Sequence, residues 1–202
     1  MDPIVCPVDA VTDLPAGLVA AVVTHLELRA APAGAPAPLP AGLALERLGG
    51  GDVDRYLALF RAVGTRWLWF SRLRLERAAL AALLDDPGVE ASAVTESGAD
   101  IGLVELDARA PAETELAFFG LVESRIGRGL GPALLRHAVA RAFARPIARL
   151  SVHTCTLDHP GALGAYQRAG FVPHRRSVEI ARDPRRLGLI PCEAGAHTPL
   201  IS

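Results

Sequence analysis

Three glycines at alternate positions are the first feature of this sequence whose spacing suggests chemistry. Gly127, Gly129 and Gly131 follow an apolar run, Leu116 to Val122, that predicts a buried strand, and they precede a pattern that predicts an amphipathic helix. Glycine lets the backbone approach a ligand closely, and a helix start offers unpaired N–H donors and a partial positive charge. The pattern therefore predicts a loop that binds phosphate.

Two common kinds of phosphate loop fit this pattern poorly. A P-loop needs Gly-x-x-x-x-Gly-Lys-Ser/Thr, but this chain contains no lysine, so all 21 of its positively charged side chains are arginines. A Rossmann loop needs G-x-G-x-x-G, ideally in the first βα unit, with an acidic residue further along for the ribose. Here the spacing is G-x-G-x-G, the loop lies late in the chain, and no acidic residue is suitably placed.

The loop resembles the acyl-CoA loop of the GNAT-type N-acetyltransferase superfamily, which usually reads Arg/Gln-x-x-Gly-x-Gly/Ala. Here the loop is Ile126 to Gly131, and Leu134 and Leu135 follow it in the helix. The first position departs from the family, because Ile126 stands where Arg or Gln is usual. Arg125 lies one residue earlier and could supply the charge from a shifted position.

A second block, residues 150–171, adds weight to the resemblance. It looks like the family's strand followed by Asn-x-x-Ala-x-x-x-Tyr-x-x-x-Gly-Phe, and the residues in register are Ala162, Tyr166, Gly170 and Phe171. His159 stands where the family often has Asn, and its imidazole could replace that amide as a hydrogen-bonding group. The resemblance covers roughly Ala91 to Ile180.

The resemblance implies both the fold and the cosubstrate. The fold class is α/β with a mixed sheet, the GNAT-like acyl-CoA N-acyltransferase fold, in which antiparallel strands precede a βαβ crossover and the central strand is splayed. The cosubstrate is acetyl-CoA, and no metal is expected. By resemblance, the backbone of Leu121 and Val122 binds the pantetheine, and the loop N–H groups bind the pyrophosphate. The implied cofactor-binding residues are Leu121, Val122, Gly127, Arg128, Gly129, Leu130, Gly131, His159, Ala162 and Tyr166.

Acetyl transfer to an amine needs an acid for the departing thiolate and a base for the amine. Tyr166 is the expected general acid, because a phenol with a pKa of about 10 keeps its proton at neutral pH. Its alternative is a residue that only packs on the cofactor. Glu115 is the candidate base, since a glutamate at this offset serves the histone-acetylating branch, whereas other members use a water chain. Glu105 is the reserve candidate, and His153 is expected to be structural.

Aromatic residues precede the resembling region, where the family builds its acceptor pocket. Trp67 and Trp69, together with Glu105, are the predicted substrate-binding residues, although ordinary core packing is the commoner role for aromatic side chains. Cys155 lies beside the presumed thioester and is expected to be a small buried residue rather than an acyl acceptor.

Elements that position these residues are predicted along the chain from periodicity and turn residues. The predicted strands are 18–28, 91–96, 101–107, 116–122, 148–154 and 171–181, and the second and third form a hairpin with a turn at residues 97–100. The predicted helices are 53–63 with Asp52 as N-cap, 76–84, one after the glycine loop, and 160–169. Three regions follow: an N-terminal strand and Pro/Ala-rich loop (1–42), a GNAT-like domain (43–181) and a tail that packs on it (182–202).

Composition restricts the partners of the protein. The formal net charge of −1 over 202 residues provides no basic excess to attract nucleic acid. The three cysteines form no C-x-x-C pair, and the apolar run 16–23 is too short to span a membrane, so we expect a cytoplasmic protein with no membrane partner. The acceptor is expected to be a small-molecule or protein amine, and a homodimer is possible because dimers are common in the family.

The sequence therefore predicts an acetyl-CoA-dependent N-acetyltransferase that acts on a primary amine by direct transfer in a ternary complex. The alternative is a non-catalytic CoA-binding or regulatory module on the same fold, because fold alone does not establish activity. A nucleotide-binding or interaction protein with an accidental glycine loop is a third and weaker hypothesis.

Overall fold

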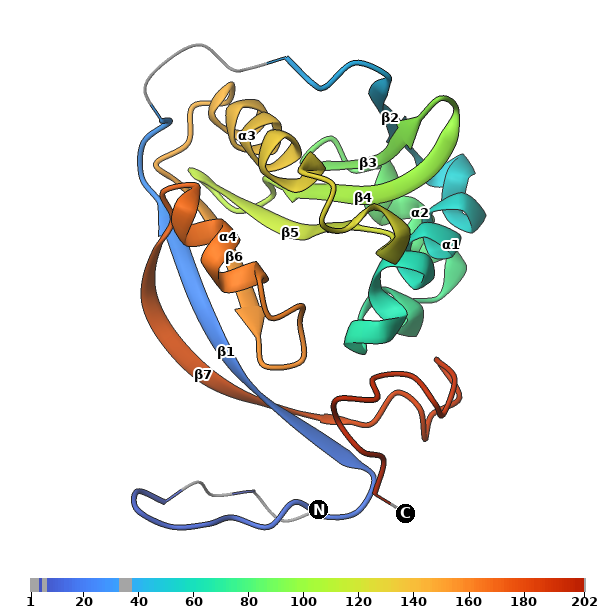
Figure 1. Cartoon of the computed structure of the whole chain (residues 1–202), viewed down its shortest axis with the longest axis vertical. Helices are drawn as coiled ribbons and strands as arrows, with labels where there is room; N and C mark the ends of the chain where they lie inside the picture. Colours follow the sequence, from blue (N-terminus) through green and yellow to red (C-terminus); the bar gives the residue numbers. More distant parts are fainter. Residues whose placement is uncertain (1–3, 5–6, 33–37, 202) are drawn as a thin grey trace.

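A seven-stranded mixed sheet, in the order β2-β3-β4-β5-β6-β1-β7, runs through the protein (Figure 1). The computed structural model describes residues 4, 7–32 and 38–201, so Cys6 and residues 33–37 of the Pro/Ala-rich segment lie outside it. The strands are β1 Leu18–Leu28, β2 Leu43–Leu48, β3 Val89–Glu96, β4 Ala99–Asp107, β5 Glu113–Leu121, β6 Arg149–Cys155 and β7 Val172–Arg182. The helices are α1 Val53–Gly64, α2 Arg77–Asp85, α3 Leu130–Phe143 and α4 Ala162–Arg168.

Most predicted elements are confirmed to within two or three residues, and two local details differ. The β3–β4 turn contains only Ser97 and Gly98, both with positive φ (52° and 81°), because a two-residue turn of this kind matches the strand twist. Asp52 does precede α1, but its carboxylate accepts a hydrogen bond from the Gly49 N–H at 2.9 Å and does not cap α1.

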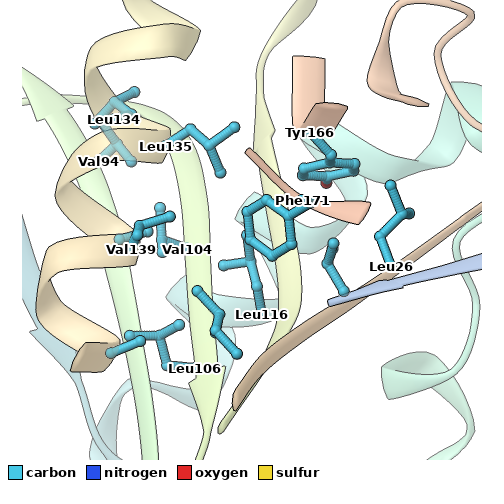
Figure 2. Close-up of a cluster of buried hydrophobic side chains, with 14 of the residues drawn as sticks. Leu26, Val94, Val104, Leu106, Leu116, Leu134, Leu135, Val139, Tyr166 and Phe171 are labelled. Atoms are coloured by element: carbon cyan, nitrogen blue, oxygen red, sulfur yellow. The ribbon is translucent and has the colours of Figure 1, made fainter. Parts of the chain in front are cut away.

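Helices cover both faces of the sheet, and the alternation of side chains along β4 divides the core between them. Val104 and Leu106 lie beside α3 in Figure 2, in a cluster that also contains Tyr166 of α4, whereas Leu103 packs with α1 and α2. The apolar stripe that periodicity predicts for α3 is buried except at its end, where Phe143 is half-buried; its buried members are Leu134, Leu135, Ala138, Val139 and Ala142. No helix in the described part of the chain is both long and apolar enough to cross a membrane.

The N-terminal strand β1 lies inside the sheet, between β6 and β7, and is antiparallel to both. It pairs with β7 from Leu18–Arg182 to Glu27–Val172. The boundary expected near residue 42 therefore falls between two strands of one sheet. The segment after β7 also packs on the domain, since Ile190 is buried in a cluster with Val19 and Ala21 of β1.

Strands β5 and β6 separate soon after they begin to pair. Their parallel register covers only Glu113–Arg149, Thr114–Leu150 and Glu115–Ser151. The crossover through α3 and this splayed central strand confirm the expected topology. A bulge in β5 also leaves Ala117 without a partner on β4, because Leu106 pairs with Leu116 and Glu105 pairs with Phe118.

The bulge changes which side chains of β5 face each layer of helices. Leu116 packs with the α3 cluster, and regular alternation would send Phe118 to the same side. Instead Phe118 packs against the α1 and α2 cluster, and Phe119 packs on the α3 side. The second half of β5 is thus turned relative to the first, at the level where β6 departs.

Candidate functional site

A cavity of about 1090 Å³ occupies the region where β5 and β6 diverge. Residues 116–121 of β5, residues 153–155 of β6 and Tyr166 of α4 line its middle. The glycine loop lines one end, and residues 67–72, which follow α1, line another part of the wall. The cavity thus joins the predicted phosphate loop to the predicted acid and base.

The glycine loop presents backbone rather than side chains to this cavity. Gly127 and Gly129 have φ angles of 80° and 78°, a left-handed conformation that costs other residues roughly 1–2 kcal/mol. Gly131 lies in the first turn of α3 without a positive φ, and a Cβ atom added there would meet nothing within 4 Å. Its lack of a side chain therefore leaves room beside the helix start, where N–H groups have no intrahelical partner.

Arginines also line this cavity. Arg136 of α3 and Arg168 of α4 line it, and within the described residues neither forms an ion pair. Arg125 forms an ion pair with Glu96 at 2.7 Å, so its charge is already engaged, and the side chain of Ile126 is 38% exposed. The open cradle and these cations fit the diphosphate of coenzyme A.

Tyr166 lies on α4 with its side chain almost fully buried, and it lines the cavity. Its ring packs edge-on against Phe171 at 5.9 Å and near Phe119 at 6.5 Å. Burial raises the pKa of Tyr166 well above that of a free phenol, and the charge of Asp158 adds to the effect. The hydroxyl therefore keeps its proton over the whole physiological pH range.

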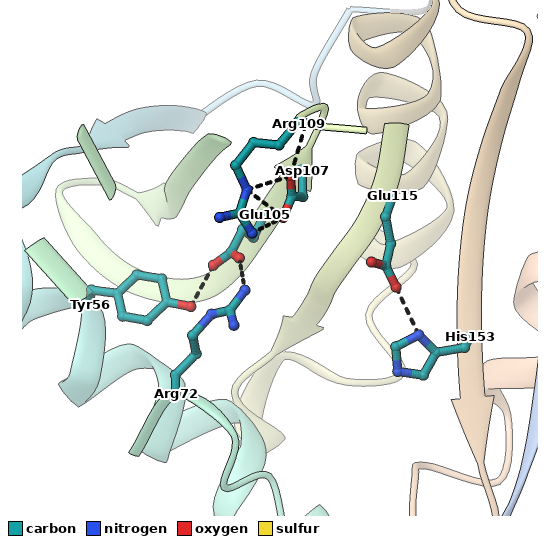
Figure 3. A network of polar contacts seen from close by, with 7 residues as sticks. All are labelled: Tyr56, Arg72, Glu105, Asp107, Arg109, Glu115 and His153. Atoms are coloured by element: carbon teal, nitrogen blue, oxygen red, sulfur yellow. Dashed lines mark hydrogen bonds and ion pairs between the residues drawn. The ribbon is translucent and has the colours of Figure 1, made fainter. Parts of the chain in front are cut away.

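Glu115 and His153 form a hydrogen-bonded pair at the point where the strands part (Figure 3). Their Oε1 and Nδ1 atoms are 2.9 Å apart, and both side chains are partly exposed. The hydrogen bond to Glu115 raises the pKa of His153 above its usual value. Sequence reasoning set His153 aside as structural, although parallel pairing of Glu115 with Ser151 places His153 on the same face.

Glu105 lies in a different environment from Glu115. Its side chain is fully buried on β4, where its two carboxylate oxygens contact the Tyr56 hydroxyl and Arg72 Nη2, each at 2.5 Å (Figure 3). Burial raises the pKa of Tyr56 far above its usual value, and the charge of Glu105 contributes as well. Glu105 does not line the cavity, although Arg72 does. These contacts indicate a structural role, in which Glu105 holds α1 and the segment that follows it against the sheet.

The two tryptophans hold the far wall of the cavity in different ways. Trp69 packs against Phe118 at 5.2 Å and Phe60 at 5.5 Å, and its Nε1 donates a hydrogen bond to Asp158 at 3.1 Å. Trp67 lies between the rings of His159 and His197, at 5.2 and 5.7 Å. Both tryptophans line the cavity.

Asp158 is the residue of this site that sequence reasoning missed. One of its carboxylate oxygens accepts from Trp69, and the other accepts from the Thr154 hydroxyl and the Cys155 N–H. It therefore ties the end of β6 to the segment after α1 across the mouth of the splay. Its place among the polar residues that follow a predicted strand, Cys155 to His159, was the available sequence signal for Asp158. The contact with Trp69 depends on the fold, because the two residues are far apart in the sequence.

The remaining predicted cofactor residues are divided by the fold. Leu121, Gly127, Gly129, Gly131, His159, Ala162 and Tyr166 line the cavity, whereas Val122, Arg128 and Leu130 do not. The Nδ1 atom of His159 accepts a hydrogen bond from the Gly161 N–H at 2.9 Å, so that part of its ring is engaged locally.

Burial raises the pKa of the Cys155 thiol to about 11, and the charge of Asp158 adds to this effect.

A sheet splayed around a cavity, with a glycine loop at a helix start, defines the class of acyl-CoA-dependent acyltransferases of the GNAT-like fold. The model of the acetyltransferase (GNAT) family matches residues 60–171, and the chain belongs to this family. Members of this family in general transfer acetyl groups from an acyl-CoA donor. A search of curated protein sequences found no match.

Solved structures share the fold at low sequence identity. A GCN5-related N-acetyltransferase from Sphaerobacter thermophilus is 16% identical with a TM-score of 0.58, over 80% of this chain and 51% of that one. A putative GNAT acetyltransferase from Novosphingobium aromaticivorans is 20% identical with a TM-score of 0.56, over 82% and 67%. This chain spans about half of the first protein and two thirds of the second.

A third solved structure is matched over nearly its whole length. It is a dodecameric spermidine N-acetyltransferase from Vibrio cholerae, 18% identical with a TM-score of 0.54, over 73% of this chain and 98% of that one.

Proposed function

We propose that the protein transfers an acetyl group from acetyl-CoA to a primary amine while both substrates are bound. The observation that carries this proposal is one continuous cavity that contains the glycine loop, Tyr166 and the Glu115–His153 pair. Holding donor and acceptor in one cavity favours direct transfer over a covalent enzyme intermediate. The high pKa of Cys155, the thiol nearest to that role, further supports direct transfer.

Each residue contributes a separate part of the reaction. The N–H groups of the glycine loop, whose three glycines line the cavity, bind the pyrophosphate, and Arg136 and Arg168 supply positive charge from the cavity wall. The backbone of Leu121, which lines the cavity at the end of β5, binds the pantetheine arm, whereas Val122 lies outside the cavity and donates its N–H to the Ile101 carbonyl at 2.9 Å. When bound, acetyl-CoA supplies an activated acyl group and a thiol leaving group. Tyr166 holds a proton at its hydroxyl oxygen, ready for the developing thiolate.

The acceptor is an amine that enters between Trp67, Trp69 and the Glu115–His153 pair. The Glu115–His153 pair supplies the base for the amine, and the aromatic wall accommodates the apolar part of the acceptor. The structural similarity to the spermidine N-acetyltransferase from Vibrio cholerae supports a small amine as the acceptor, and protein amines belong to the same chemical class. A cytoplasmic location and a homodimer stay predictions from the sequence.

A second candidate function is binding of CoA without catalysis. The observation that favours it is the loss of two family side chains near the cofactor, since Ile126 carries no charge and His159 is hydrogen-bonded to its own turn. Such a protein would sense the acyl-CoA pool through the same loop.

The two functions are separated by a binding assay and a turnover assay on the same preparation. We expect CoA and acetyl-CoA to raise the unfolding temperature, and amines to release CoA thiol from acetyl-CoA. Tyr166→Phe should lower kcat by about 10²-fold while leaving CoA binding intact. Binding without thiol release across a broad amine panel would favour the second function. A protein that shows no thermal shift at saturating CoA would rule out both.

A further inference from the structure

The pairing of His153 with Glu115 fixes which ring nitrogen carries a proton. An ionised carboxylate can only accept hydrogen bonds, so the Nδ1 atom, 2.9 Å from Glu115 Oε1, must be the donor. In the neutral ring, the Nε2 atom then carries a free lone pair. Figure 3 shows this second nitrogen on the side of the ring away from Glu115, and His153 lines the cavity.

We propose that His153 takes the proton from the acceptor ammonium, and that Glu115 is the positioning residue that orients and supports it. The proposal rests on the proposed acetyl transfer. In the step itself, one N–H bond of the ammonium breaks and its proton bonds to Nε2 of His153. The nitrogen keeps the electron pair and becomes a neutral amine that can attack the acyl carbon. The imidazolium then releases its proton to solvent, which reaches the partly exposed ring.

Groups on every neighbouring element act on His153. Glu115 on β5, Asp158 after β6 and Glu179 on β7 are all acidic, and each favours its protonated form. His25 on β1 is the facing base, with its ring centroid 5.9 Å away. A second imidazolium there would oppose protonation of His153, so the charge state of His25 decides how strongly His153 can attract a proton.

Contacts from β7 keep His25 neutral. Arg175 Nη2 donates to His25 Nδ1 at 3.1 Å, and His25 Nε2 pairs with the Ser177 hydroxyl at 2.9 Å. Burial lowers the pKa of His25, and the charge of Arg175 lowers it further. The two adjacent histidines are therefore shifted in opposite directions, and His153 alone is prepared to gain a proton.

An imidazole also suits the chemistry better than a carboxylate. A primary ammonium has a pKa of about 10, whereas unperturbed glutamate and histidine have values of about 4.3 and 6.5. The equilibrium constant for proton transfer from the ammonium is therefore larger by two or more orders of magnitude when the acceptor is an imidazole with a raised pKa than when it is a carboxylate. Above this raised pKa the ring is neutral and available as a base.

The test compares three variants over a range of pH: Glu115→Gln, His153→Gln and His137→Gln, the last a control on α3 outside the cavity. In the unmodified protein, kcat/KM should rise with pH through the raised pKa of His153. Glu115→Gln keeps a hydrogen-bond acceptor but loses the charge. The rise of kcat/KM with pH should therefore move to lower pH, with less than a tenfold loss of rate. His153→Gln should lower kcat/KM by about 10²–10⁴-fold and should abolish its rise with pH.

A different pattern would overturn the proposal. If kcat/KM of Glu115→Gln falls 100-fold at every pH while His153→Gln keeps both the rate and its rise with pH, Glu115 is itself the base. If neither variant changes the profile, a water chain performs the step.

A readout without turnover keeps the two proposals distinguishable. NMR titration of the ring protons of His153 should give a pKa above 6.5 that falls in Glu115→Gln and stays unchanged in His137→Gln. An unshifted His153 would overturn the pairing whatever the activity. Turnover without any effect of His153→Gln would remove only this inference, whereas CoA binding without turnover of any amine would remove the proposed function together with it.

Discussion

Replacing Glu105 with glutamine tests whether this carboxylate supports the structure or the chemistry. The change keeps the shape of the side chain but removes its charge, and it leaves Arg72 facing an amide in a pair whose side chains are 17% and 0% exposed. Removing one partner of a buried ion pair costs about 3–5 kcal/mol, and the lower end applies because the amide still bonds one neighbour. At roughly 2–4 °C per kcal/mol, the unfolding temperature should fall by about 6–12 °C.

A matched control is available on the neighbouring strand. Glu113 pairs with Arg149 at 2.6 Å, but these side chains are 26% and 39% exposed. Exposed pairs contribute only about 0–1 kcal/mol, so Glu113→Gln should lower the unfolding temperature by less than about 4 °C.

Urea unfolding followed by fluorescence, together with thiol-release kinetics, separates the two roles. We expect Glu105→Gln to unfold at lower urea with kcat within about threefold of the unmodified protein at 20 °C. A variant as stable as Glu113→Gln would refute the assignment of a buried, structurally essential charge. A 100-fold loss of kcat in a fully stable protein would instead place Glu105 in the chemistry.

Two further predictions concern the loop and the thiol. Gly131→Ala should fold as stably as the unmodified protein and bind CoA at least tenfold more weakly by calorimetry, because its Cβ would enter the space beside the helix start. Gly129→Ala should also lose about 1–2 kcal/mol of stability, because its φ is positive, and equal stability of the two variants would contradict this argument. Iodoacetamide at pH 7.5 should alkylate the exposed Cys192 at least tenfold faster than Cys155, whose raised pKa leaves little thiolate, as measured by peptide mass spectrometry.

Local sequence signals predicted those parts of the fold and site that depend on local geometry. The glycine loop and the stripe of α3 follow from spacing along one strand–loop–helix segment, where 3.6-residue periodicity and positive φ leave a clear pattern. Tyr166 was selected because residues 150–171 resemble the family's second motif. The hairpin of β3 and β4 was found for the same reason, since its partners are adjacent in the chain.

Pairings between distant segments were not predicted. The periodicity of β1 identified a strand but could not identify β6 and β7 as its neighbours, because any apolar strand offers the same backbone groups. Glu105 looked like a site residue because an isolated carboxylate on a strand gives no sign of Tyr56 and Arg72 above it. The roles of Asp158 and His153 likewise depend on the segment after α1 and on the register with β5.

The position of β1 also determines when this sheet can form during folding. The strand belongs to the first thirty or so residues, yet it cannot complete its pairing until β7 is available, and the contact between His25 and Ser177 spans 152 positions. Contacts this distant slow folding, because the chain must lose loop entropy before they stabilise it. We therefore expect β2 to β5 with α1 and α2 to gain structure first. The cavity would then be completed late, by strands from both ends of the described chain.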